Sequence, residues 1–98
     1  MSLHQLEWTQ DSTEDYEQLG GSQKIFVNKA LDRIKLRGME AGQPLHGNLA
    51  QCNKLKNKKM GLLIIFREAE GTIQVIQIVA IGKRDKEKIH KMAEERLS

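Results

Sequence analysis

The chain has 98 residues, of which 39% are hydrophobic and 30% charged, with one cysteine and a formal net charge of +3. A chain of this length closes one modest core, so we expect a single domain over residues 1–98. One cysteine excludes an internal disulfide, and no apolar run approaches the roughly 20 residues of a membrane helix. The N-terminus has no basic segment followed by an apolar one, so we expect a cytoplasmic protein without a secretory signal and without a membrane partner.

The first forty residues predict a short strand followed by a helical hairpin. Apolar and polar residues alternate over residues 4–8, as in a strand. A first, short helix is expected to start at Asp11 and to end at the glycine pair 20–21. A second helix, about residues 23–37, has Gly38 as its C-terminal cap. Its apolar residues fall at helical spacing on one face: Val27, Ala30, Leu31 and Ile34.

The second half predicts strands. Residues 39–50, which include Pro44, predict a loop. Three strands follow, over residues 51–57, 61–67 and 72–81, and the continuous apolar run of the middle one is typical of a strand buried on both faces. Their connections are too short for crossovers, so they are expected to form an antiparallel meander.

A final helix is expected to begin after Asp85, which suits its N-terminal cap. Its apolar residues lie on one face: Ile89, Met92, Ala93 and Leu97. The predicted order is β-α-α-β-β-β-α. We therefore expect an α+β fold in which the helical hairpin and the C-terminal helix pack on one face of a small, twisted antiparallel sheet.

Positive charge is concentrated in the second half of the chain. Residues 1–44 carry five Lys or Arg and seven Asp or Glu, a net charge of −2, whereas residues 45–98 carry eleven and six, a net charge of +5. Such an imbalance favours a polyanion as partner. A solvated, charge-rich surface explains it equally well, and both interpretations stay open here.

Metal and cofactor chemistry find no support in the sequence. His4, His46 and His90 are far apart in the chain, and Cys52 has no partner at the spacing of a zinc ligand pair. We expect no metal and no cofactor.

The basic side chains of one strand suggest an anion site. Within a strand, Lys54, Lys56 and Lys58 point to the same side, with Lys59 next to them. Like charges on one face repel each other, and a bound anion relieves this repulsion. An exposed strand edge protected by charge gives the same pattern, so the two interpretations stay open.

A second basic cluster surrounds the start of the last helix, where Lys83, Arg84 and Lys86 lie close together in sequence. Cations are unfavourable at the positive end of a helix dipole unless an anion such as a phosphate binds there. His90 follows Lys86 by one turn, at the border of the apolar face. It is either a surface residue or part of this cluster.

These groups suit RNA cleavage without a metal. The 2′-hydroxyl must lose a proton, the phosphate gains charge, and the leaving 5′-oxygen needs a proton. A lysine crowded by other cations can act as the base. An arginine can stabilise the added charge, and a histidine can donate the proton.

Four segments, taken in order, resemble the RelE/ParE superfamily of toxins from toxin–antitoxin pairs. They are GQPLHGNL at 42–49, CNKLK at 52–56, GLLIIFR at 61–67 and IVAIGKRD at 78–85. RelE-like members cleave mRNA in the ribosomal A site, whereas ParE-like members poison DNA gyrase without being enzymes. The resemblance implies a cytoplasmic toxin with the ribosome, mRNA and a cognate antitoxin as partners.

The resemblance also implies site residues. Lys54 and Lys56 match the lysine pair of the RelE pattern, Arg84 matches its second arginine, and His90 falls where RelE-like members carry a tyrosine. We assign these four as catalytic. The neighbouring cations are assigned to RNA binding: Lys58, Lys59, Arg67, Lys83 and Lys86.

One position departs from the RelE pattern. Leu63 stands where the first arginine is expected, and Arg67 lies on the same strand and face about 13 Å further on, at roughly 3.3 Å per residue. The lysine pair favours a ribosome-dependent mRNA endonuclease, whereas Leu63 favours the alternative, a ParE-like inhibitor of gyrase. The first is the stronger prediction because a binder needs no cationic catalytic set.

Overall fold

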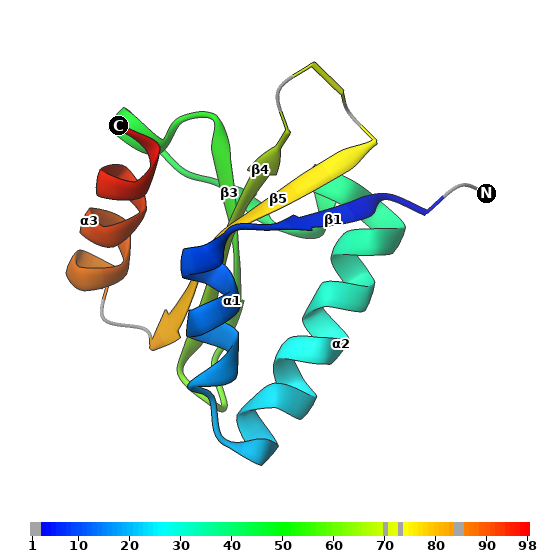
Figure 1. Cartoon of the computed structure of the whole chain (residues 1–98), viewed down its shortest axis with the longest axis vertical. Helices are drawn as coiled ribbons and strands as arrows, with labels where there is room; N and C mark the ends of the chain where they lie inside the picture. Colours follow the sequence, from blue (N-terminus) through cyan, green and yellow to red (C-terminus); the bar gives the residue numbers. More distant parts are fainter. Residues whose placement is uncertain (1–2, 70, 73, 84–85) are drawn as a thin grey trace.

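The computed structural model describes residues 3–69, 71, 72, 74–83 and 86–98, and within them it has the predicted α+β architecture (Figure 1). None of the described helices has the length and apolar character needed to cross a membrane. The strands are β1 (Gln5–Trp8), β2 (Gln43–Pro44), β3 (Cys52–Asn57), β4 (Leu62–Glu68) and β5 (Val75–Lys83). The helices are α1 (Gln10–Glu17), α2 (Gly21–Arg37) and α3 (Lys86–Leu97), with 3-10 turns η1 (Gly38–Ala41) and η2 (Gly47–Leu49).

Helix α1 begins earlier than predicted. Its N-cap is Thr9, whose side chain accepts a hydrogen bond from the Ser12 backbone N–H at 3.0 Å, while the Ser12 hydroxyl accepts one from the Thr9 N–H. This reciprocal capping box satisfies two backbone donors that the first turn leaves unpaired. The expectation that Asp11 starts the helix is therefore wrong, because Asp11 already lies in its first turn.

The sheet has the strand order β1-β5-β4-β3-β2. The meander of β3, β4 and β5 is antiparallel, as predicted, but β1 pairs with β5 in parallel. The sheet is thus mixed, and the expectation of a fully antiparallel sheet is wrong. Parallel neighbours need a long connection between them, and the helical hairpin together with the meander supplies one. Within the predicted loop 39–50, β2 adds a short edge strand against β3.

Apolar side chains cover both faces of the sheet, and this decides where the helices lie. On one face α2 packs against β4 and β5, through Val27, Leu31, Ile34, Leu62, Ile64, Phe66, Ile76, Ile78 and Ile81. On the other face α3 and the η2 turn pack through Leu45, Leu49, Cys52, Leu63, Ile65, Val79, Ala80, Ile89 and Ala93. The expectation that all helices share one face is wrong. The hairpin already fills its face, so the second apolar face of β4 and β5 is left for α3 (Figure 1).

A β-bulge interrupts the pairing of β4 with β5. Ile65 lies opposite Ala80 and Phe66 opposite Ile78, so Val79 is an extra residue on β5. Because side chains alternate along a strand, an extra residue shifts this alternation by one position beyond the bulge. It also disturbs the local hydrogen-bond ladder. At this bulge the Val79 carbonyl accepts a hydrogen bond from Arg96 of α3.

Candidate functional site

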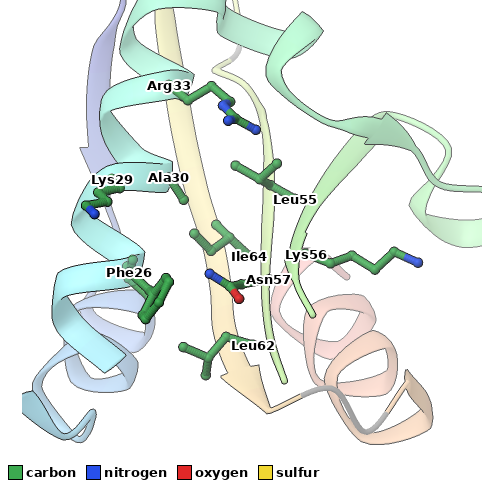
Figure 2. Close-up of a pocket in the computed structure, with 10 residues that line it drawn as sticks. Phe26, Lys29, Ala30, Arg33, Leu55, Lys56, Asn57, Leu62 and Ile64 are labelled. Carbon is green, nitrogen blue, oxygen red and sulfur yellow. The ribbon is translucent and has the colours of Figure 1, made fainter. Parts of the chain in front are cut away.

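Strand β3 presents Lys54 and Lys56 on the face of the sheet that α3 covers. They alternate with Leu55, which packs in the core on the α2 side. Their partners on β4 are Ile65 and Leu63, both of which belong to the α3-side core. Both lysines are half-buried. In Figure 2 the Lys56 side chain runs away from α2, toward the side of the sheet where α3 lies.

Further cations gather at one end of the sheet. Lys58 and Lys59 occupy the turn between β3 and β4, and Lys83 ends β5. Leu62, the first residue of β4, pairs with both Asn57 and Lys83, so the turn and the end of β5 lie next to each other. The three exposed lysines therefore lie at the end of the sheet where β3 ends, just beyond Lys56.

The structure describes only part of the second basic cluster. Arg84 and the cap residue Asp85 lie outside the described residues. Lys86 is the first residue of α3, which begins at the same end of the sheet as the lysine turn. The assigned roles of Arg84 and Lys86 therefore stay predictions.

Arg67 is not brought together with the lysines. It lies at the opposite end of β4, paired with Cys52 on β3 and Gln77 on β5. Its Nε donates a hydrogen bond to the Gln77 side-chain oxygen at 2.8 Å, and the Gln77 amide donates one to the Glu7 carboxylate at 2.7 Å. The guanidinium is thus engaged in a polar chain across β4, β5 and β1, and RNA binding by Arg67 finds no support in this geometry.

Leu63, which stands at the position expected for an arginine, is a core residue. It is 2% exposed and lies between Lys56 on β3 and Gly82 on β5, within the apolar cluster under α3. An apolar core residue, and not a cation, therefore occupies the middle of the face that carries the lysine pair.

His90 lies on α3 next to the face that packs on the sheet. Ile89 and Ala93 face the sheet, and residue 90 follows Ile89 by one helical step of about 100°. Its Nε2 is buried and has no hydrogen-bond partner among the described residues. Buried polar atoms without partners are rare in proteins and mark functional groups in many cases. For Nε2 to meet a substrate its covering side chains must move; otherwise Nδ1 must serve. Nowhere in the described part of the chain do three His, Cys, Asp or Glu side chains gather as metal ligands.

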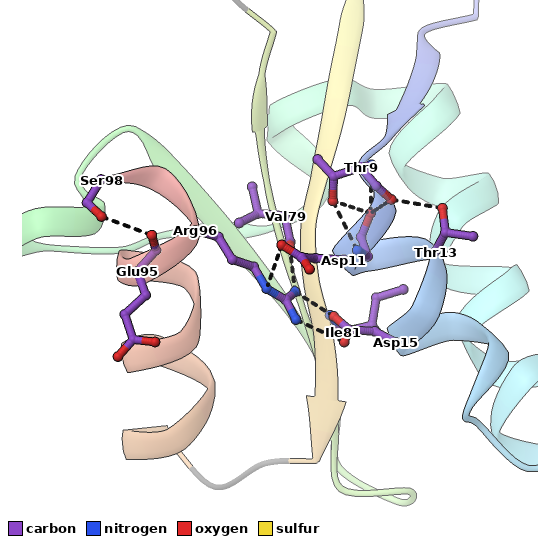
Figure 3. Close-up of polar contacts among 10 residues, drawn as sticks. Thr9, Asp11, Thr13, Asp15, Val79, Ile81, Glu95, Arg96 and Ser98 are labelled. Carbon is purple, nitrogen blue, oxygen red and sulfur yellow. Dashed lines mark hydrogen bonds and ion pairs between the residues drawn. The ribbon is translucent and has the colours of Figure 1, made fainter.

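An ion pair between α1 and α3 was not anticipated from the sequence. The Arg96 guanidinium binds the Asp15 carboxylate through both terminal nitrogens, at 2.7 and 3.1 Å (Figure 3). The two side chains are 17% and 14% exposed. The hydrogen bond that Arg96 donates to Asp15 raises the pKa of Arg96 above its usual value, and the Asp15 charge acts in the same direction, against the effect of burial. Eighty-one positions separate the partners, so no local pattern signals the pair.

The surroundings of Cys52 predict an unreactive thiol. Cys52 is fully buried, and this burial raises the pKa of the thiol above its usual value despite the nearby Arg67. A thiol needs its thiolate form to react. We expect iodoacetamide at neutral pH to leave Cys52 unmodified in the folded protein and to modify it on unfolding in guanidinium, as read by intact mass. Rapid modification of the folded chain would contradict this arrangement.

The face of the sheet opposite α3 has an apolar cleft of about 220 Å³ between α2 and strands β3 and β4. Its lining includes Phe26, Val27, Ala30, Leu55, Leu62 and Ile64. Figure 2 shows Phe26 of α2 facing Leu62 and Ile64 of β4, with Arg33 extending from α2 toward the strands above them. Arg33 is exposed. Lys29, Lys56 and Asn57 also line the cleft, which thus combines apolar walls with polar and cationic residues.

Comparison with known proteins shows the fold. No protein-family model and no curated protein matches the chain. Among solved structures, a mutant of the E. coli toxin RelE in the free state is similar over all of both chains, with a TM-score of 0.78 and 19% sequence identity. The intact E. coli RelBE toxin–antitoxin complex is similar over 82% of this chain and 95% of that one, with a TM-score of 0.69 and 20% identity.

A ParE-type structure is similar to a lesser degree. The chromosomal ParDE toxin–antitoxin system of P. aeruginosa matches 82% of this chain and 95% of that one, with a TM-score of 0.53 and 16% identity. The predicted RelE/ParE fold is therefore confirmed, and this likeness is greater to the RelE structure than to the ParDE structure.

Proposed function

We propose that this chain is the toxin of a toxin–antitoxin pair and a RelE-like, ribosome-dependent endoribonuclease. The observation that carries the proposal is the combination of a RelE fold over the whole chain with Lys54 and Lys56 on the face covered by α3. The fold alone would not carry it, because one fold serves many activities.

The proposed reaction uses the side chains of that face. One of the lysines takes the proton of the 2′-hydroxyl, whose oxygen then attacks the phosphorus. Arg84 stabilises the charge that builds up on the phosphate. His90 donates a proton to the leaving 5′-oxygen. Lys58, Lys59 and Lys83 attract the RNA backbone without contributing to the chemistry.

The alternative, a ParE-like gyrase inhibitor, has one observation in its favour. Leu63 is buried where the RelE pattern has an arginine, so one positive charge expected around the phosphate is missing. A binder has no use for that charge.

A pulse of expression in a bacterial host separates the two functions. We expect translation to fall first, measured by amino-acid incorporation, while DNA synthesis continues. An early SOS response with intact translation would instead indicate gyrase inhibition. The Lys54→Ala, Lys56→Ala double variant is the matched control, because it keeps the fold but removes the proposed base.

We further propose that the antitoxin is an acidic, amphipathic segment that inserts apolar side chains into the cleft between α2 and strands β3 and β4. The apolar walls and the exposed Arg33 at the rim support this chemistry. Segments of this kind commonly become ordered on binding.

Antitoxin binding is expected to weaken as salt is added, because salt screens exposed charges. Arg33→Gln should weaken binding by up to about fivefold, the range of an exposed ion pair. Arg37→Gln, on the last residue of α2, is the control and should bind as the parent does. Titration calorimetry at several salt concentrations measures both. Affinity that is independent of salt and of Arg33 would point to a purely apolar interface elsewhere.

A further inference from the structure

The Asp15–Arg96 pair takes the place of a strand on β5. Strand β1 pairs with β5 only as far as Ile78, and the chain then turns into α1. Beyond that point the Ile81 N–H donates a hydrogen bond to the Asp15 carboxylate at 3.1 Å, and the Val79 carbonyl accepts one from Arg96 at 2.9 Å (Figure 3). Backbone groups that would be left without a strand neighbour are thus satisfied by the two side chains.

The same pair fixes α3 to the body of the molecule. Helix α3 has 12 residues, a length at which an isolated helix is marginal in water. Its apolar contacts with the core under it come from buried Ile89 and Ala93 and partly buried Met92 and Leu97, and apolar packing alone gives little directional constraint. Arg96 adds a directional contact to three separate groups: a carboxylate of α1, a backbone carbonyl of β5 and, at 3.7 Å, Asp11.

His90 is sensitive to the orientation that Arg96 fixes. The two residues are six positions apart, about 9 Å along the helix axis. A helical side chain reaches roughly 5–6 Å from the axis, so a rotation of α3 by about 10° moves its tip by about 1 Å. A misplacement of that size costs up to about 10²-fold in rate.

We propose that Asp15 and Arg96 are positioning residues, which hold α3 in the one orientation from which His90 reaches the scissile phosphate, through Nδ1 or after the side chains that cover Nε2 have moved. This rests on the proposed nuclease function. Neither residue touches the RNA, and they act through the backbone of α3.

Removing one partner alone leaves the other charge stranded in a mostly buried place, which destabilises the fold for a trivial reason. The test is therefore the double variant Asp15→Asn with Arg96→Gln, which removes both charges and keeps a polar, though shorter, side chain at residue 96. We expect kcat for mRNA cleavage on programmed ribosomes to fall by about 10²-fold, with KM within about threefold of the parent. Arg37→Gln, an exposed arginine of α2, is the control and should keep both constants.

A second variant and a second measurement keep the outcome decisive. Arg96→Lys retains the charge and one donor to Asp15, so it should recover part of kcat. Hydrogen exchange by mass spectrometry should show lost protection in residues 86–97 of the double variant and not in α2. An unchanged kcat in the double variant overturns the proposal. A rise in KM as large as the expected fall in kcat also overturns it, because it would indicate lost substrate binding. If the parent itself does not cleave, the nuclease function fails, and unchanged protection of α3 in the double variant would separately refute the anchoring.

Discussion

His90→Gln is expected to slow mRNA cleavage on programmed ribosomes by about 10²–10⁴-fold, the usual range for loss of a general acid or base. Glutamine has a similar volume and a polar end, but its amide transfers no proton at neutral pH. Nε2 is buried and has no hydrogen-bond partner among the described residues, so replacing the ring breaks no structural hydrogen bond at that atom. Replacing it should therefore cost chemistry and little folding energy.

The matched control is Lys58→Ala, in the turn between β3 and β4. Lys58 is exposed, so its loss should weaken the general attraction to RNA and reduce cleavage far less than His90→Gln. Both variants are compared at equal thermal stability. Cleavage by His90→Gln at the rate of the parent would show that another group donates the proton.

Gly42→Ala is expected to have the largest effect on folding. A Cβ at residue 42 would overlap the backbone carbonyl of Lys54 and lie 2.8 Å from the Phe66 ring. A carbonyl within β3 cannot move without breaking the pairing of β2 with β3. Overpacking of this kind costs about 1–3 kcal/mol, occasionally more, and each kcal/mol lowers Tm by roughly 4–8 °C in a domain of this size.

Thermal unfolding followed by circular dichroism measures this effect. Gly21→Ala is the control, because a Cβ at Gly21 meets no atom within 4 Å, and its Tm should stay near that of the parent. Equal Tm values for the two variants would contradict the close approach at Gly42. Gly42→Ala should also lower cleavage in proportion to the fraction of the protein that is unfolded at the assay temperature.

The elements were predictable from the sequence because their signals are local. The period of α2 and the continuous apolar run of β4 each determine a structure within about ten residues. That Lys54 and Lys56 point to the same face follows from the two-residue period of side chains in a strand. The capping box at Thr9 escaped prediction because its third residue is Ser12, whereas the usual signature has Glu or Gln there.

Features that depend on distant partners were not predictable. β4 and β5 are apolar on both faces, so the sequence did not decide which face α3 covers. The parallel pairing of β1 with β5 joins residues seventy positions apart. Asp15 lies in a helix with several acidic residues and Arg96 in one with many charges. Helices of this composition are typical of a solvated surface, so neither sequence indicates a partly buried ion pair. The close approach at Gly42 has no sequence signal beyond the glycine itself.

The central claim is metal-free cleavage of mRNA by attack of a 2′-hydroxyl, and a single substitution in the substrate tests it directly. The parent chain, dialysed beforehand against a chelator, is added to ribosomes programmed with one mRNA, either all-ribose or carrying one 2′-deoxy nucleotide at the cleaved position. We expect the all-ribose message to be cut at the A-site codon and the 2′-deoxy message to stay intact at that bond. Equal cutting of both messages, or an intact all-ribose message, would contradict the account.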